Sequence, residues 1–159
     1  MLLGMKFFSL VLASALVIIA MILIPNVLMG LNFDLNLPVY TFPYVNYFGV
    51  AVVLSGVLLD LYCIYLFLTF GRGTPVPVDP PQILVAKGIY ARSRNPMYIG
   101  YLLIILGEFI FFGHLLLLGY FFLAVVLIHL FIVFYEEPVL KKRFGETYLE
   151  YLQKTPRWL

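Results

Sequence analysis

The sequence predicts an all-α integral membrane fold: about four transmembrane helices and a C-terminal amphipathic helix, forming a single domain over residues 1–159. Composition and length lead to this prediction. The chain is 64% hydrophobic and 11% charged, whereas a soluble domain carries about 25% charged residues. A chain of 159 residues has too little interior to hide so much apolar surface, so lipid must solvate part of it. The net charge of +2 gives no reason to expect nucleic-acid binding.

Four apolar stretches predict the membrane spans, since a helix needs about 20 residues to cross the hydrocarbon core. They cover about 5–30, 45–70, 97–113 and 115–135. The first is interpreted as an uncleaved span, because its apolar run is too long for a signal peptide. The segments 31–44 and 71–95 contain many Pro, Gly, Asn and Asp residues and are expected to be loops. A tight turn is expected at Gly113-His114.

Nine of the ten Lys and Arg residues lie outside these spans, and the tenth, Lys6, stands at the N-terminal edge of the first. With four spans, every one of them falls on the same side of the membrane, and the opposite loops carry only Asp34 and His114. The positive-inside rule then places both termini and the 71–95 loop in the cytoplasm. The membrane would be a bacterial inner membrane or that of the endoplasmic reticulum.

The segment after Glu137 changes its periodicity. Apolar residues recur every four positions from Leu140 to Leu152, with charged residues between them, which predicts an amphipathic helix over about 139–153. Such a helix can be a membrane-surface anchor. It can equally be a lid folded under the helix bundle, over the polar loop.

Polar residues concentrate at two points that a hairpin of the last two spans would bring together. Asn95-Pro96 is typical of a helix start, where Asn caps and Pro fits the first turn. With Arg94 beside it, this helix start would suit a carboxylate or phosphate. The acidic pair Glu136-Glu137 stands where the fourth helix is expected to end, where the helix dipole disfavours acids. A salt bridge from Arg94 or a basic tail residue, a bound cation or a ribose diol would each compensate it.

The remaining polar residues give weaker signals. Asp60 and Glu108 lie inside predicted spans, where carboxylates are costly and face the bundle interior. Each can be a protonated carboxyl with a structural role or part of a proton path. His129 is expected to be a packing residue, and two distant histidines do not make a metal site. A single cysteine, Cys63, excludes an internal disulfide.

The second half of the chain resembles the isoprenylcysteine carboxyl methyltransferase and phospholipid methyltransferase superfamily. The resemblance covers roughly residues 70–159. Its motifs are Gly71-x-Gly73-Thr74-Pro75, Pro80-Pro81, Leu84-Val85, Gly88-x-Tyr90, Arg94-x-Pro96-x-Tyr98-x-Gly100, Glu136-Glu137, Leu140, Phe144-Gly145, Tyr148, Tyr151 and Pro156-Arg157-Trp158.

This resemblance implies an enzyme that transfers a methyl group from S-adenosylmethionine to a carboxylate or amine of a membrane-embedded lipid or prenylated substrate. The implied cofactor site comprises Leu84, Val85, Gly88, Tyr90, Arg94, Asn95, Tyr98, Glu136 and Glu137. Glu137 is a candidate proton acceptor for an amine substrate. Arg157 is a candidate for orienting an anionic acceptor or for closing the tail over the cofactor.

One departure from the family pattern concerns the substrate. Asn95 stands where the eukaryotic prenylcysteine enzymes have His, and Asn does not titrate near neutral pH. Two other functions stay open at this level. One is a non-enzymatic four-span protein or a proton-linked transporter that uses Asp60 and Glu108. The other is an NADPH-dependent membrane reductase, because sterol reductases resemble this superfamily.

Overall fold

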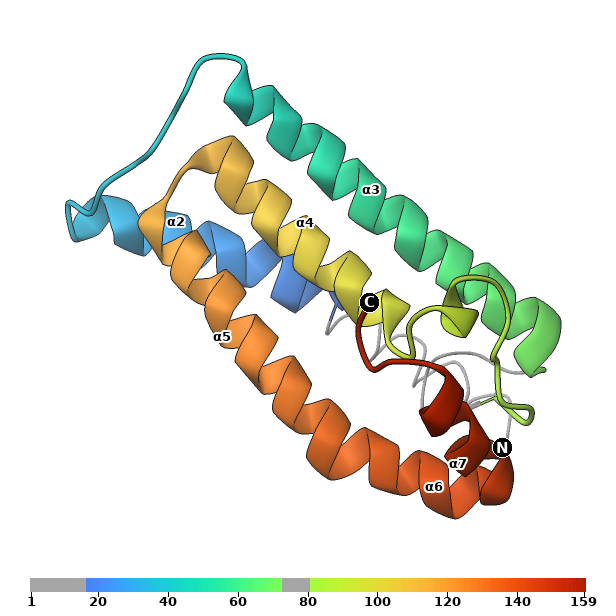
Figure 1. Cartoon of the computed structure of the whole chain (residues 1–159). Helices are drawn as coiled ribbons and strands as arrows, with labels where there is room; N and C mark the ends of the chain where they lie inside the picture. The colour runs from blue at the N-terminus through green and yellow to red at the C-terminus, as the bar shows by residue number, and fades with distance from the viewer. Residues whose placement is uncertain (1–16, 73–80) are drawn as a thin grey trace, which may run out of the picture.

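The computed structural model describes residues 17–72 and 81–159. Within these ranges the protein is helical, as predicted, and only an isolated bridge between Val39 and His114 has β geometry. The elements, in chain order, are η1 (Ile19–Leu23), α2 (Ile24–Asp34), α3 (Val45–Leu66), η2 (Phe67–Gly71), η3 (Gly88–Ala91), α4 (Pro96–Phe112), α5 (Leu115–Phe131), η4 (Ile132–Glu136), α6 (Glu137–Phe144) and α7 (Glu146–Lys154) (Figure 1).

Two continuous helices are long and apolar enough to cross a membrane. They are Val45–Gly71, which joins α3 to the π-helical η2, and Leu115–Phe144, which joins α5, η4 and α6. The helices Ile19–Asp34 and Pro96–Phe112 are apolar but shorter. Residues 5–16 of the first predicted span lie outside the described residues. The helix of that span ends at Asp34 and not at residue 30, so 31–34 are helical where a loop was expected.

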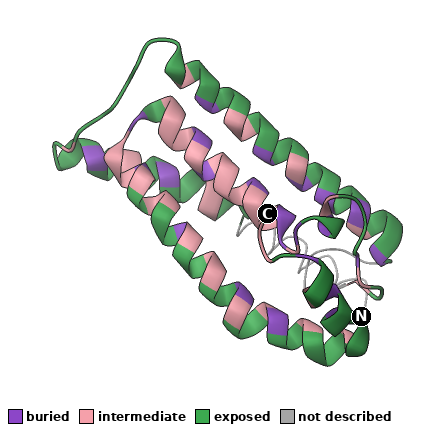
Figure 2. Ribbon diagram, in the orientation of Figure 1, coloured by how far each residue is buried: buried purple, intermediate pink, exposed green. Residues whose placement is uncertain are grey.

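The outer surfaces of the long helices are apolar and exposed (Figure 2). On α3, for example, Leu58 is 65% exposed, and on α5 Phe122 is 59% exposed. Such a continuous apolar exterior would be unfavourable in water, whereas hydrocarbon solvates it without cost.

Helices α3 and α4 run antiparallel and pack backbone to backbone through four glycines (Figure 1). A Cβ added to Gly49 would lie 2.6 Å from the Gly107 carbonyl oxygen, and one added to Gly56 would lie 2.6 Å from the Gly100 carbonyl oxygen. Both pairs are spaced seven residues apart on their helices, so they recur on one face. Small residues of this kind let helices approach closely where no hydrophobic effect drives them together.

Two buried or half-buried asparagines join the loops at the end of the bundle opposite the chain's basic loop. Asn32 Nδ2 donates to the Leu37 carbonyl at 3.1 Å, and its Oδ1 accepts from the Leu116 N–H at 3.0 Å. Asn46 Nδ2 donates to the Phe111 carbonyl at 2.7 Å. These bonds hold the α2–α3 loop against the tight α4–α5 turn, which lies at Gly113-His114 as predicted.

The fourth helix and the tail differ from the prediction. The helix does not end near residue 135: η4 continues into α6, so the acidic pair lies inside a continuous helix. The wider π-helical turn directly precedes Pro138, which would clash with the carbonyl four residues back in a regular α-helix. The tail helix expected at 139–153 is broken at Gly145, whose φ of +53° is accessible to glycine but strained for other residues.

The close contact between α3 and α4 predicts that Gly49→Ala lowers the stability of the protein, whereas Gly→Ala usually raises it in an exposed helix. In an exposed helix interior, Gly→Ala stabilises by up to about 1 kcal/mol. Gly49→Ala places a methyl group against the Gly107 carbonyl, and overpacking of this kind costs about 1–3 kcal/mol. Thermal unfolding in detergent or bicelles should therefore show a lower Tm for Gly49→Ala.

Gly119→Ala on α5 is the matched control, because a Cβ there meets nothing within 4 Å. Its Tm should equal or exceed that of the wild type. Equal Tm values for the two variants would show that α3 and α4 do not depend on close backbone contact.

Candidate functional site

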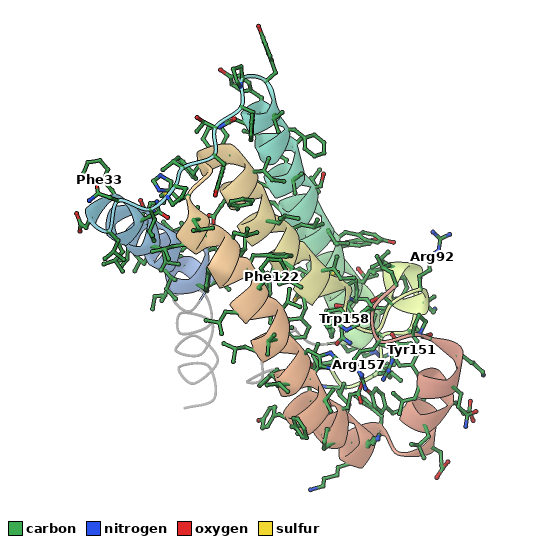
Figure 3. The ribbon with its side chains drawn as sticks, turned by 60° about the vertical axis from the view of Figure 1, so that its left-hand side comes forward. Phe33, Arg92, Phe122, Tyr151, Arg157 and Trp158 are labelled. Atoms are coloured by element: carbon green, nitrogen blue, oxygen red, sulfur yellow. The ribbon has the colours of Figure 1, made fainter. Side chains whose placement is uncertain are left out.

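A buried carboxylate holds two arginines where the loop before α4 meets the tail. Glu137, at the start of α6, is 7% exposed. Its Oε1 accepts from Arg94 Nη1 at 2.9 Å and from Arg157 Nε at 2.8 Å, and its Oε2 accepts from Arg157 Nη2 at 3.1 Å. Figure 3 shows Arg157 directed into this region from the tail. The predicted salt bridge to the acidic pair therefore exists, and it uses both Arg94 and a basic tail residue.

Glu137 lies past the end of the hydrocarbon core. The Leu115–Phe144 helix is 30 residues long, about 45 Å, whereas the hydrocarbon core is about 30 Å thick. Its charged end, from Glu136 onward, therefore extends past the core.

The two arginines fix the charge of Glu137. Burial alone would raise the pKa of Glu137, but the hydrogen bond from Arg157 and the charges of both arginines lower it below its usual range. A carboxylate with a lowered pKa and occupied oxygens is a poor proton acceptor, so the arrangement does not support the catalytic role expected of Glu137.

The tail is also bound through its backbone. The Arg94 N–H donates to the Pro156 carbonyl at 3.0 Å, and Asn95 Nδ2 donates to the Arg157 carbonyl at 3.0 Å. Fully buried Ser93 contributes its hydroxyl, which accepts from the Asn95 N–H at 3.2 Å. Asn95 does occupy the N-cap position of α4, but its side chain makes no capping bond, contrary to the prediction. The amide is engaged by the tail instead.

Two tyrosines of α7 complete the contact between tail and loop. Tyr151 is 7% exposed, and its hydroxyl donates to the Tyr90 carbonyl at 2.6 Å. Tyr148 is 2% exposed and hydrogen bonds with Arg94; burial raises the pKa of both phenols. The tail thus folds back onto the loop, as the lid interpretation of the amphipathic segment expected. The every-fourth-residue pattern identified Tyr148, whereas nothing in the sequence singled out Ser93 as a support.

Glu136, by contrast, retains unused hydrogen-bonding capacity. Its carboxylate accepts a hydrogen bond from the Tyr98 hydroxyl, but its Oε2 is buried and has no partner. Arg94 Nε is likewise buried and without a partner. Buried polar atoms are nearly always hydrogen-bonded in folded proteins, so these two atoms are available to bond an ordered water or a ligand.

Four predicted site residues lie apart from this cluster. Val85 and Tyr90 belong to the apolar core with Cys63 and Leu66, and the Tyr90 ring packs edge-on against Phe67. The ring of Tyr90, which the resemblance placed in the cofactor site, therefore lies in this core. Gly88 has a φ of +60°, which favours glycine, and a Cβ there would lie 2.6 Å from the Tyr62 hydroxyl.

Leu84, which precedes the core residue Val85, is half-buried. The motif residues Gly73, Thr74, Pro75 and Pro80 lie outside the described residues.

The carboxylates inside the helices do not join the cluster. Asp60 on α3 is buried against Gly100, and its Oδ1 has no partner. Glu108 is two helical turns beyond Gly100 on α4, about 12 Å along the axis, so the two do not form one site. In the described ranges, no group of three or more His, Cys, Asp or Glu residues could hold a metal ion.

Comparison with known proteins identifies one family. The model of the phospholipid methyltransferase family matches residues 44–147, which include α3 to α6 and the start of α7. No curated protein and no solved structure matches the chain significantly. The matched region contains the loop before α4 and the acidic pair but ends before Arg157.

The Glu137 cluster predicts that acid releases the tail. Folding lowers the pKa of Glu137 below its usual value of 4.5, so the ionised carboxylate stabilises the folded state at a pH above 4.5. This stabilisation is lost as the pH falls from 4.5 through the lowered pKa. Trp158 is the sole tryptophan and follows Arg157, so its fluorescence reports whether the tail is bound. Its emission maximum should shift to the red as the pH falls below the usual range of glutamate.

Two variants isolate the contribution of Glu137. Glu137→Gln should show the red-shifted emission already at neutral pH, because the neutral amide cannot pair with two guanidinium groups. Glu150→Gln removes a carboxylate that is 71% exposed, and its emission should follow that of the wild type. A Glu137→Gln protein with wild-type emission at every pH would refute the assigned role.

Proposed function

Because the chain belongs to the phospholipid methyltransferase family, we propose that it transfers a methyl group from S-adenosylmethionine to an amine or carboxylate of a membrane lipid or prenylated substrate. Membership of this family implies a membrane methyltransferase. The two long apolar helices agree with that location. The four-span topology, with both termini and the basic loop in the cytoplasm, is part of the same proposal.

The buried unpartnered atoms of Glu136 and Arg94 carry the proposal of a cofactor site. S-adenosylmethionine combines a carboxylate, an ammonium group, a ribose diol and a sulfonium cation. Arg94 Nε can donate to the carboxylate, since guanidinium groups favour anionic oxygens. Glu136 Oε2 can accept from the ammonium group or the ribose hydroxyls. The half-buried Tyr98 ring can lie against the sulfonium, because an aromatic face attracts a cation.

Glu137 and Arg157 then act as positioning residues. Glu137 holds Arg94 in place, and through Arg157 it holds the tail over the loop before α4. The cofactor supplies an electrophilic methyl group. The protein's own contribution is to orient the nucleophile in line with that methyl group and to exclude water, which accounts for much of the rate of such transfers. A carboxylate acceptor is already nucleophilic and needs no base, whereas an amine acceptor would react as the neutral amine after losing its proton to water.

This proposal predicts a binding defect for Glu136→Gln. Isothermal calorimetry on protein in lipid nanodiscs should detect binding of S-adenosylmethionine and of its demethylated product. Loss of a hydrogen bond to a charged group costs about 1.5–3 kcal/mol, so Glu136→Gln should weaken binding about tenfold or more. Glu150→Gln, on the exposed face of α7, should bind like the wild type.

Methyl transfer itself is measured with methyl-labelled cofactor and nanodiscs that contain phosphatidylethanolamine or a prenylcysteine. Label in the lipid fraction supports the assignment and identifies the acceptor. A folded wild-type protein that binds NADPH but neither form of the methyl cofactor would overturn it in favour of a reductase.

A further inference from the structure

Exposed aromatic residues concentrate at the end of the bundle away from α6 and α7, where the α2–α3 loop leads into α3 (Figure 1). Five of them lie between residues 40 and 48 and are 48% to 85% exposed. These five, here called the aromatic face, are Tyr40, Phe42, Tyr44, Tyr47 and Phe48. No residue from Leu35 to Leu59 carries a charge. This part of the surface is therefore both aromatic and electrically neutral.

Hydrogen bonds of the main chain hold this loop in place without using the aromatic rings. The Tyr40 N–H donates to the Gly113 carbonyl at 2.8 Å. The Phe42 N–H donates to Asn46 Oδ1 at 2.9 Å. Because the loop is attached through its backbone, it presents the exposed rings at a fixed position relative to the α4–α5 turn.

Tyr44 has an uncommon backbone conformation for its size. Its φ is +71°, a value that few residues other than glycine adopt and that is an outlier for a bulky side chain. Strain of this kind persists where surrounding interactions compensate it. Tyr44 is 85% exposed, so packing within the chain gives its ring little compensation. A surrounding outside the chain that takes up the ring would supply it.

Tyrosine rings and hydroxyls together define which surrounding fits the aromatic face. Water is unfavourable for several large rings exposed together. The hydrocarbon core is unfavourable for the tyrosine hydroxyls, which find no hydrogen-bond partner there. The layer of lipid head groups and ester carbonyls accommodates both parts of the side chain, and tyrosine is enriched in that layer. The aromatic face also continues directly into the lipid-facing side of α3, where Leu54 is 56% exposed.

We propose that the aromatic face is a membrane anchor, which inserts into the head-group layer of the leaflet opposite the basic loop. The α2–α3 loop then lies in the membrane boundary and not in water. With a neutral aromatic anchor at one end and basic residues at the other, the depth of the bundle in the bilayer is set at both boundaries. The anchor goes beyond the proposed function, because its test needs neither a cofactor nor a methyl acceptor.

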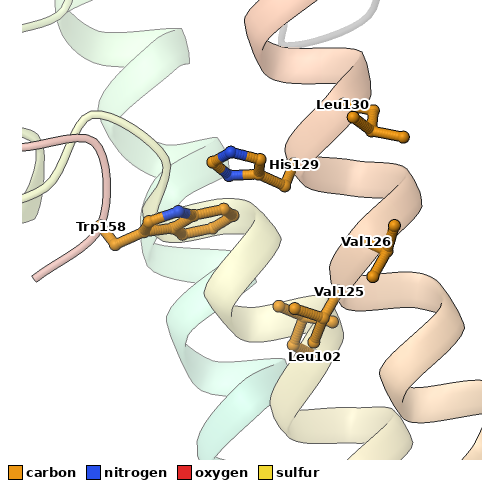
Figure 4. Close-up of a pocket in the computed structure, with 6 residues that line it drawn as sticks. All are labelled: Leu102, Val125, Val126, His129, Leu130 and Trp158. Carbon is orange, nitrogen blue, oxygen red and sulfur yellow. The ribbon is translucent and has the colours of Figure 1, made fainter.

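Depth-dependent fluorescence quenching tests this anchor. The probe is Tyr44→Trp in a Trp158→Phe background, which removes the native tryptophan and keeps an aromatic ring against His129 (Figure 4). The protein is placed in nanodiscs of phosphatidylcholine that is brominated either near the glycerol or near the end of the acyl chain. Bromines near the glycerol should quench Tyr44→Trp several-fold more than bromines near the chain end, and aqueous iodide should quench it little.

Lipid charge gives a second reading of the same probe. The aromatic face carries no charge, so added salt or a share of anionic lipid should leave the bromine quenching of Tyr44→Trp unchanged. A strong dependence on either would show that charge and not aromatic insertion places the loop, which would overturn the proposal.

Two matched variants in the same background calibrate the depth. Leu58→Trp lies near the middle of the Val45–Gly71 helix at a position that is 65% exposed, so bromines near the chain end should quench it most. Glu150→Trp replaces a side chain that is 71% exposed on α7, and iodide should quench it strongly. Should Tyr44→Trp fail to fold, Tyr47→Trp stands one turn along the same face of α3 with the same expectation.

Two results would overturn the anchor. Quenching of Tyr44→Trp by iodide to the extent seen for Glu150→Trp, with no quenching by brominated lipid, would place the loop in water. Protection of Tyr44→Trp from both iodide and brominated lipid would show that protein, such as a second copy of the chain, covers the aromatic face.

Discussion

The pairing of one buried carboxylate with two arginines determines how the site is assembled. Arg94 precedes α4, Glu137 begins α6 and Arg157 follows α7, so a single carboxylate joins three segments that are distant in sequence. Removal of one partner from a buried charge cluster is costly, because the remaining charges lose their compensation. Glu136 precedes Glu137 in the sequence, so this region brings two acids and two arginines together and their formal charges balance.

The helix bundle provides the rigid frame for this cluster. In hydrocarbon, association of helices relies on close van der Waals contact and on a few hydrogen bonds. The glycine face between α3 and α4 provides the close van der Waals contact. The asparagine side chains, at the end of the bundle opposite the basic loop, provide the hydrogen bonds. Because α4 is fixed at both places, its first turn presents Arg94, Asn95 and Tyr98 at a defined position relative to α5.

Hydropathy and turn residues were sufficient to predict the helical class and the helices near 45–70, 97–113 and 115–135. The acidic pair and Arg94 were also identified from the sequence, because charges beside apolar segments need partners. The role of each residue was harder to predict. Val85 and Tyr90 belong to motifs close to that of Arg94 yet pack into the core, since a motif records spacing and not the direction of a side chain. Similarly, the break at Gly145 interrupts a periodic pattern that sequence analysis treated as continuous.

The π-helical turn η4 has a consequence for how this chain can change in length. It places Glu136 and Glu137 at the end of a wider turn, and successive residues of a helix differ by about 100° in direction. Loss of one residue within η4 would bring Glu137 to the direction now held by Glu136, and Pro138 to that of Glu137. The arginines would then face a residue with no charge. An insertion or deletion in this turn should therefore not be tolerated, because its residue count sets the angular register of the acidic pair.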